Sequence, residues 1–166
     1  MKFFRLWIES QLVKPEHRSL PVTQIYCWLW TRDKKIALVS KNGKDWQLPG
    51  GHPKEGESIL ETLRRELQEE LSLDIGGVSQ VPKLFGYYVI EERERGVLKR
   101  RYVQMRTFLL LEDRSDVFEI QPQEDPREKE EDKIRFVCWC NLSRAKELIP
   151  WLAASEELKS FLKLVS

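Results

Sequence analysis

Apolar and polar positions alternate along the first part of the chain, a pattern that predicts short β-strands. From Thr23 to Arg32 the alternation carries bulky side chains on both sides, as in a central strand that is covered on both faces. A second short strand is predicted for residues 36–40, which the turn signal Asn42-Gly43 follows. A third is predicted for Trp46-Gln47-Leu48. The chain then reaches Pro49-Gly50-Gly51, where a helix cannot continue.

A helical period follows this glycine pair. Leucines recur at steps of three and four residues, which places them on one face of a helix; they are Leu60, Leu63, Leu67 and Leu71. Ser58 and Glu61 have the spacing of a capping box. The sequence therefore predicts a long helix that begins directly after Ser58.

The second half of the chain predicts a hairpin, a loop, a strand and two short helices. The hairpin strands run from Leu84 to Glu91 and from Tyr102 to Leu111, joined by a polar stretch over 92–99 around Gly96. The acidic run from Pro122 to Lys133 predicts an exposed loop, and 134–140 predicts the last strand. The helices are expected to be capped by Ser143 and Ser155, and the second has an apolar face of Leu158, Phe161, Leu162 and Val165.

This order of elements favours an α/β fold, a sandwich with a mixed sheet between helices. The first 20 residues have no readable period, and they could form an extra strand, a helix or an arm that reaches a partner subunit. We expect this N-terminal arm to precede a single domain over residues 21–166, because a chain of 166 residues suffices for one core.

Composition narrows the class of protein. Apolar residues make up 41% and charged residues 33%, which is typical of a globular protein. The formal net charge is +1, so neither a membrane surface nor a long nucleic acid is an expected partner. The three cysteines lack the CxxC spacing of zinc sites, and no signal peptide or membrane span is readable. Free thiols and a cytoplasmic protein are the expectation.

The predicted helix carries candidate metal ligands. Glu66, Glu69 and Glu70 stand at positions i, i+3 and i+4, so they share one arc of the helix. Three like charges repel, and Arg65 offsets only part of that repulsion. The excess of carboxylate oxygen suits a hard cation such as Mg²⁺, which is often shared with substrate phosphates. A solvated acidic face is the alternative, but the preceding glycine pair and Glu57 favour a site.

These residues resemble the Nudix box, the motif G-x5-E-x7-R-E-U-x-E-E-x-G-U, over residues 51–73. Eight positions are in register: Gly51, Glu57, Arg65, Glu66, Leu67, Glu69, Glu70 and Leu73. One position departs, since Ser72 stands where the family has a glycine at the end of the helix. Serine can adopt the left-handed backbone of that position at about 1 kcal/mol. All charged positions of the motif are present.

The resemblance implies a Nudix hydrolase of the MutT-like type, an α/β/α sandwich with a mixed central β-sheet. Such an enzyme cleaves a diphosphate bond in a nucleoside triphosphate or another nucleoside diphosphate derivative by attack of water at phosphorus. The resemblance implies a site for Mg²⁺, or Mn²⁺, made by Gly51, Glu66, Glu69 and Glu70. It also implies a catalytic set of Glu57, Arg65, Glu69 and Glu70, in which Glu57 and Arg65 orient the metal-binding glutamates.

The identity of the general base stays open at this point. Family members use either a glutamate of the box or an acid from a late loop. Glu70 is the first choice here. The late-loop candidates could equally form a solvated charge run; they are Glu128, Glu130, Glu131 and Asp132.

Candidate substrate-binding residues lie outside the motif. Trp151 follows a predicted helix where some nucleotide-cleaving relatives stack an aromatic ring on the base, a contact worth about 1–3 kcal/mol, but it could instead cap the core. Tyr88 is near the spacing of a tyrosine associated with dinucleoside-polyphosphate hydrolases, although strand tyrosines usually pack. Arg101 and its basic neighbours could reach a phosphate or a partner subunit, or form a solvated tip. A homodimer is a further option.

The alternative to an enzyme is a catalytically inactive Nudix-like module that binds a nucleotide or docks on a protein. Degenerate sensors usually lose glutamates of the box, and this sequence retains them, which favours the hydrolase. Cleavage of an RNA cap would need a basic path for the RNA, which the near-neutral net charge does not indicate.

Overall fold

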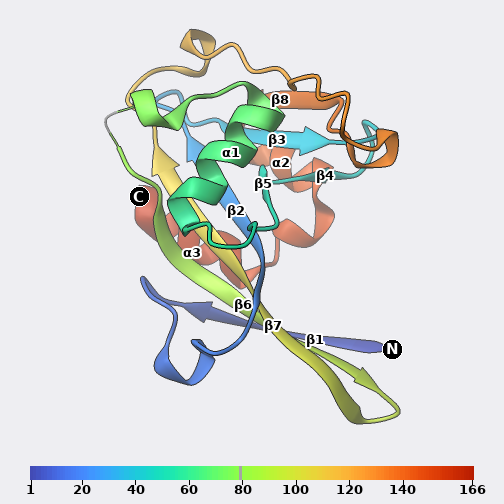
Figure 1. The fold of residues 1–166 in the computed structure, drawn as a ribbon. Helices are drawn as coiled ribbons and strands as arrows, with labels where there is room; N and C mark the ends of the chain where they lie inside the picture. The colour runs from blue at the N-terminus through green and yellow to red at the C-terminus, as the bar shows by residue number, and fades with distance from the viewer. Residues whose placement is uncertain (79) are drawn as a thin grey trace.

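A mixed β-sheet runs through the molecule in the computed structural model, which describes residues 1–78 and 80–166 (Figure 1). The main path of the sheet is β1-β6-β7-β2-β3-β4, with β5 paired to β2 and β8 paired to β3. The β2–β7 pair is parallel and the other pairs are antiparallel. The strands are β1 (Lys2–Glu9), β2 (Val22–Trp30), β3 (Ile36–Ser40), β4 (Trp46–Gln47), β5 (Gly50–Gly51), β6 (Lys83–Glu94), β7 (Val97–Leu110) and β8 (Phe136–Cys140).

Helices cover both faces of this sheet. Helix α1 (Ile59–Leu71) packs on one face, and α2 (Leu142–Leu148) and α3 (Glu156–Val165) pack on the other (Figure 1). Short 3-10 turns connect the elements: η1 (Pro15–His17), η2 (Ile75–Gly77), η3 (Ser115–Val117), η4 (Glu130–Asp132) and η5 (Pro150–Leu152). The predicted α/β sandwich with a mixed sheet is therefore confirmed. Within the described ranges, no helix combines the length and the apolar character that a membrane crossing requires.

Strand β2 divides the hydrophobic core into two halves. Ile25, Cys27 and Leu29 point toward the α1 side, whereas Trp28 points toward the α3 side. Trp28 stacks on Phe161 of α3 with ring centroids 4.3 Å apart, a geometry that adds to the burial of both rings. The sequence pattern predicted this double-sided strand, and its alternation fixes which residues face α1.

The N-terminal residues form an extra strand, one of the three structures considered for them. Strand β1 pairs with β6 along its whole length, from Lys2↔Arg93 to Glu9↔Gly86. Trp7 anchors the strand, because its Nε1 donates to Ser160 Oγ of α3 at 2.9 Å. The N-terminal strand is thus an edge of the same sheet that carries the rest of the fold.

The hairpin is longer than predicted, and the expected polar loop over 92–99 is wrong. Strand β6 continues to Glu94 and β7 begins at Val97, so only Arg95 and Gly96 form the turn, both with positive φ (50° and 78°). Carboxylates and arginines face each other across this ribbon, as in Glu92↔Arg100. Cross-strand charge pairs stabilise a solvated ribbon without an apolar alternation, which is why the pattern missed it. The ribbon projects from the body (Figure 1).

The structure corrects three smaller predictions, which concern the N-cap of α2 and the burial of one leucine in each of α1 and α3. Leu60 was expected on the buried face of α1, but 39% of its surface is exposed. Helix α2 is capped by Asn141, whose Oδ1 accepts from the backbone N–H of Arg144 at 2.8 Å, rather than by Ser143. Leu162 of α3 is also 39% exposed. The expectation of free thiols is confirmed for all three cysteines.

Candidate active site

Capping fixes both ends of helix α1. Ser58 Oγ accepts from Glu61 N and Glu61 Oε2 accepts from Ser58 N, each at 3.1 Å, so the predicted capping box is present. Leu63, Leu67 and Leu71 are fully buried against the sheet. Because these leucines set the rotation of the helix, the glutamates of the neighbouring arc lie beside strand β5.

Ser72 ends the helix in the left-handed conformation that the family's glycine would favour, with φ 54° and ψ 34°. Its hydroxyl donates to the carbonyl of Gln121 at 2.7 Å. The backbone N–H groups of Gln121 and Gln123 donate to the carbonyls of Leu71 and Glu69 at 3.1 and 2.8 Å. The segment that leads into the acidic loop therefore caps the last turn of α1 and holds that loop beside the helix.

The glycine pair of β5 allows the chain to approach both β2 and α1. Gly50 has φ 137°, and a Cβ there would overlap the carbonyl of Ile25. A Cβ on Gly51 would overlap the carboxylate of Glu66. Glycine is needed at position 50, and at position 51 it lets the Glu66 carboxylate lie directly against the backbone.

Arg65 braces the acidic side chains. Its Nε and Nη2 donate to the two carboxylate oxygens of Glu57 at 2.8 and 2.9 Å, and its Nη1 donates to Glu66 Oε1 at 2.8 Å. Nη2 also donates to the carbonyl of His52 at 3.0 Å, and Nη1 lies 3.6 Å from Glu69 Oε2. The hydrogen bonds from Arg65 are the main reason that the pKa of Glu57 is held at about 2. Glu57 is therefore ionised and fixed.

Two glutamates on α1 resist ionisation. Burial raises the pKa of Glu66, although the hydrogen bond from Arg65 opposes this shift. Burial also raises the pKa of Glu70 well above its usual range, opposed by the Gly50 N–H, which donates to Glu70 Oε1 at 2.7 Å. Neighbouring negative charges, including that of Glu69, raise it further. A cation bound here would reverse these shifts.

The donor set fits Mg²⁺ or Mn²⁺ in its chemistry, since it consists of carboxylates and a backbone carbonyl. In the parts of the chain that the structure describes, no three acidic, His or Cys side chains converge into a ready metal cluster. Arg65 holds Glu66, and Gly50 N–H holds Glu70. The side chain of Glu69 is 45% exposed, and its only ion pair among the described residues is the 3.6 Å contact with Arg65.

One acid of the late loop approaches the helix. Burial, followed by the charge of Glu69, raises the pKa of Glu128, and the charge of Glu128 in turn acts on Glu70. Glu131 is exposed in η4. Ion pairs engage the other two acids of the predicted set, Glu130 with Lys133 and Arg135, and Asp132 with Lys41. Glu128 is therefore the late-loop acid best placed to act with the box.

A small pocket of about 230 Å³ lies beside β5 on the α3 side of the sheet. Trp151 stands at its rim with 48% of its surface exposed, so the ring does not seal the core. A ring that is half exposed at the rim of a pocket is accessible to a ligand. The pocket is lined by Tyr26, Trp46, Gln47, Leu48, Arg106, Ile149, Trp151 and Leu152.

The other two predicted substrate residues differ in their distance from this pocket. Tyr88 is buried, with its ring between Arg5 Cζ at 4.3 Å and Arg106 Cζ at 5.0 Å from the ring centroid. Arg101 lies on the projecting ribbon, where its Nε is 3.4 Å from Glu91 Oε1. The structure brings Tyr88 close to the Trp151 pocket and leaves Arg101 on the ribbon.

Sequence reasoning missed a buried charge cluster beside this pocket. Arg106 Nε donates to Glu157 Oε1 at 2.9 Å, and Trp28 Nε1 donates to Glu157 Oε2 at 3.0 Å. Both charged side chains are almost fully buried. One signal was available: Glu157 stands four residues before Phe161, on the apolar face predicted for the last helix.

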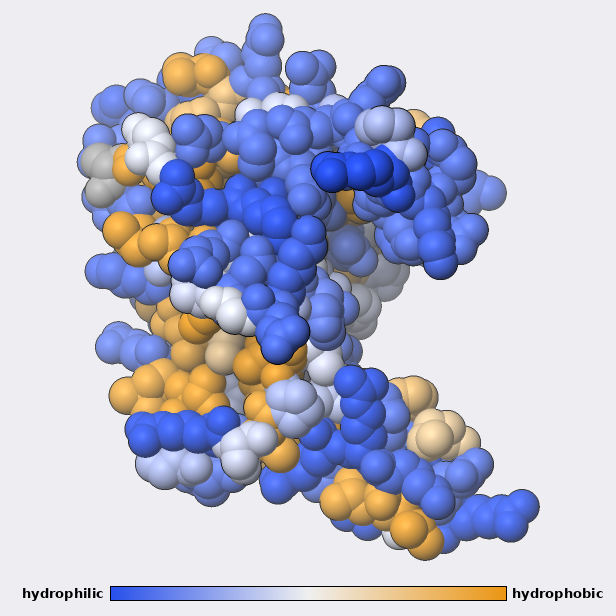
Figure 2. Space-filling model, in the orientation of Figure 1, coloured by the Kyte–Doolittle hydropathy of each residue, from blue (hydrophilic) through white to orange (hydrophobic). Residues whose placement is uncertain are grey.

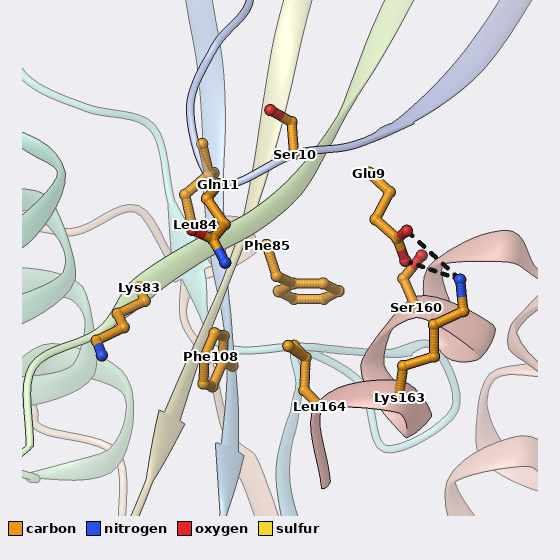
Figure 3. Close-up of a pocket in the computed structure, with 10 residues that line it drawn as sticks. All are labelled: Glu9, Ser10, Gln11, Lys83, Leu84, Phe85, Phe108, Ser160, Lys163 and Leu164. Carbon is orange, nitrogen blue, oxygen red and sulfur yellow. Dashed lines mark hydrogen bonds and ion pairs between the residues drawn. The ribbon is translucent and has the colours of Figure 1, made fainter. Parts of the chain in front are cut away.

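A cavity larger than the Trp151 pocket is separate from these residues. It measures about 700 Å³ and lies between the end of β1, the start of β6 and helix α3 (Figure 3). The rings of Phe85 and Phe108 line it, and the ion pair between Glu9 and Lys163, 3.3 Å apart, borders it. Its lining includes no residue of the box, so its size does not identify the reactive centre.

Comparisons with known proteins agree with the resemblance of residues 51–73. A family model described as NUDIX domain matches residues 21–161, so the chain belongs to this family. A mutant of the Bacillus subtilis pyrophosphohydrolase BsRppH has a similar fold, with TM-score 0.63, 20% identity, and coverage of 99% of this chain and 96% of that one. The C. elegans Ap4A hydrolase gives TM-score 0.56, 15% identity, and coverage of 89% and 100%. None of the curated proteins matches the sequence.

Family membership and the retained charges of the box together support the expectation of a Nudix pyrophosphohydrolase. The two solved structures support the fold alone, because their sequence identities to this chain are only 20% and 15%.

Proposed function

We propose that this protein is a metal-dependent hydrolase that cleaves a diphosphate bond in a nucleoside triphosphate or another nucleoside diphosphate derivative, with water attacking phosphorus. One observation carries the proposal. Glu66 and Glu70 are held without a full complement of positive charge, on the helix face that adjoins the glycine pair. Burial, followed by the charges of neighbouring glutamates, raises their pKa values. Such a face is completed by a cation and its phosphate ligand.

Glu66, Glu69, Glu70 and the carbonyl of Gly51 would hold Mg²⁺, or Mn²⁺. The bound ion would neutralise phosphate oxygens and lower the pKa of a coordinated water. The Nudix family generally uses divalent metal ions, and the donor types of this chain agree with that use.

The residues around the glutamates orient them. Arg65 fixes Glu66 and Glu57 through charge-assisted hydrogen bonds, and the Gly50 N–H fixes one oxygen of Glu70. Because these contacts restrict the carboxylates before substrate arrives, less ordering is needed at the reacting centre.

Glu70 is the proposed general base. One of its oxygens accepts from Gly50 N–H and the other is available to take a proton from water. Glu128 is the alternative, because it is the late-loop acid whose charge acts on Glu70.

A hydrolysis assay with identified products tests the proposal. Nucleoside triphosphates and nucleoside diphosphate derivatives are incubated with Mg²⁺, with and without a chelator, and the fragments identify the phosphorus attacked. We expect turnover that needs the metal and that falls at least about 100-fold in Glu69→Gln and Glu70→Gln. Glu55→Gln is the matched control, because Glu55 is an exposed glutamate of the preceding loop. Metal-independent turnover, or full turnover in both variants, would contradict the proposal.

The inactive binding module is the other outcome of this assay. Tight nucleotide binding without any product after prolonged incubation would favour it. A Glu128→Gln variant distinguishes the two candidate bases, since the true base is the one whose loss changes the pH profile of kcat.

A homodimer stays a prediction, and the projecting ribbon is where we expect its contact. Strand β1 is a sheet edge with exposed Phe3, Phe4 and Leu6, and Val97 and Leu98 are exposed near the hairpin turn. Apolar surface is visible on this ribbon in Figure 2. Exposed apolar edges in native proteins are usually covered. Light scattering coupled to size exclusion tests this, and a monomer mass at assay concentration would contradict it.

A further inference from the structure

An arginine of the N-terminal strand reaches the rim of the Trp151 pocket. Arg5 lies on β1, outside the residues 21–161 that match the family model. Its Cζ is 4.3 Å from the ring centroid of Tyr88 and 5.4 Å from that of Trp151. The edge strand therefore adds a guanidinium to a pocket that is otherwise built by the matched region.

The charge of Arg5 is available to a ligand. Two arginines flank Tyr88, but Arg106 is buried and its charge is matched by Glu157. Arg5 is exposed and makes no ion pair with any residue of the described ranges 1–78 and 80–166. Stacking on Tyr88 orients its planar guanidinium without using up its hydrogen-bond donors.

Strand β5 links the pocket on the α3 side of the sheet to the acidic face of α1. Tyr26 lines the pocket and pairs in the sheet with Gly50, whose N–H binds Glu70. Burial raises the pKa of Tyr26, and the charges of Arg106, Glu70, Glu66 and Arg5 also act on its hydroxyl. A substrate with its diphosphate at the glutamates can place its organic end in the pocket, with the far edge toward Arg5.

We propose that Arg5 is a specificity-determining residue that selects a base with two adjacent hydrogen-bond acceptors on its outer edge, as guanine has. The inference rests on the nucleotide substrate class of the proposed function. A guanidinium donates two parallel hydrogen bonds to the O6 and N7 acceptors of guanine. Adenine presents an acceptor beside an amino donor on that edge, so one donor of Arg5 would be left without a partner. Trp151 supplies the ring on which the base stacks.

Binding of nucleoside monophosphates tests this inference, because GMP and AMP contain no diphosphate bond to be cleaved. Calorimetric titrations compare the native protein with Arg5→Ala and Arg5→Lys. We expect the native protein to bind GMP at least about tenfold more tightly than AMP, and both variants to lose most of this preference. Lys2→Ala is the matched control, since Lys2 is an exposed cation of the same strand and its loss removes the same charge without touching the pocket.

A merely structural role for Arg5 would change the affinities for both nucleotides together, whereas the inference requires a change in their ratio. Lysine keeps the charge but not the planar fork, so an Arg5→Lys variant with the native GMP preference would overturn the inference. Equal affinities of the native protein for GMP and AMP would also overturn it.

The outcome is separable from that of the proposed function. If GTP is hydrolysed with Mg²⁺ while Arg5→Ala leaves the GMP preference unchanged, the inference about Arg5 fails and the hydrolase stands. If no nucleotide is hydrolysed while the preference depends on Arg5, the hydrolase fails and the base-selecting site stands.

Discussion

Two clusters of arginine and glutamate lie on opposite sides of the same sheet, and they differ in charge balance. On the α3 side, Arg106 is matched one to one by Glu157, which is fully buried. On the α1 side, Arg65 forms ion pairs with both Glu57 and Glu66, and Glu69 lies 3.6 Å from the same guanidinium. The first cluster is complete in itself, whereas the second has an excess of negative charge.

The difference separates a structural role from a functional one. A buried pair with all its hydrogen bonds made is costly to break, because either partner alone is a buried charge without compensation. An excess of carboxylates without matching positive charge destabilises the fold, and such a cost in stability is a common property of functional sites.

The largest effect is expected when the buried pair is broken. Glu157→Gln removes the negative charge that faces Arg106 and should lower the free energy of unfolding by about 3–5 kcal/mol. Denaturant unfolding followed by Trp fluorescence measures this. Glu156→Gln is the matched control, because Glu156 is the exposed neighbour in the same turn of α3, and its change should stay within about 0.5 kcal/mol. An equally small effect of Glu157→Gln would show that the pair does not stabilise the fold.

A gain in the free energy of unfolding, in place of a loss, is expected for Glu70→Gln in metal-free protein. Because the pKa of Glu70 is higher in the folded state than the ordinary value of 4.5, ionisation of this group destabilises the fold as the pH rises above 4.5 and through the raised pKa. Glutamine does not titrate. The variant should therefore gain stability relative to the native protein between pH 4.5 and 8, while its activity falls at least about 100-fold.

Unfolding curves at pH 4.5 and pH 8 in the presence of a chelator measure this difference. Added Mg²⁺ should stabilise the native protein more than the variant at pH 8, because only the native site regains a full set of ligands. If the stability difference between the native protein and Glu70→Gln did not change with pH, the raised pKa of Glu70 in the folded state would be contradicted.

The contrast also explains how far the sequence could be interpreted. Helix α1, its capping box and the shared arc of its glutamates were predicted, because these residues are close in sequence and their spacing reveals a shared face. The cluster on the α3 side joins Arg106 to Glu157 across 51 positions of sequence, and no local period reports such a contact. The same holds for Arg5, which reaches Trp151 only because β1 pairs with β6.

The ends of helices and strands show the same difference between local patterns and long-range contacts. The capping box at Ser58 is a local pattern and was predicted, whereas the cap at Asn141 was assigned to Ser143, two residues away. The ribbon beyond Glu91 was missed because solvated strands need no apolar alternation. The sequence therefore predicts features that depend on neighbouring residues, and it does not predict contacts between distant segments.

The smallest effect is expected at Ser72, which links the acidic helix to the late loop. Ser72→Gly relieves the left-handed backbone but loses the hydrogen bond to Gln121, two effects of about 1 kcal/mol each, so the change in stability should be near zero. Ser72→Ala loses the bond and keeps the backbone conformation, and it should cost about 1 kcal/mol. Denaturant unfolding compares the two. No loss of stability in Ser72→Ala would contradict the contribution of the hydrogen bond, and equal losses in both variants would contradict the relief of the backbone in Ser72→Gly.

The excess negative charge on α1 is tested most directly by a crystal structure of the protein with Mn²⁺ and a non-cleavable nucleoside triphosphate analogue. The account predicts an anomalous peak within about 2.0–2.4 Å of carboxylate oxygens from Glu66, Glu69 or Glu70, with the diphosphate beside it. A nucleotide bound elsewhere, with these carboxylates facing water and no metal between them, would contradict it.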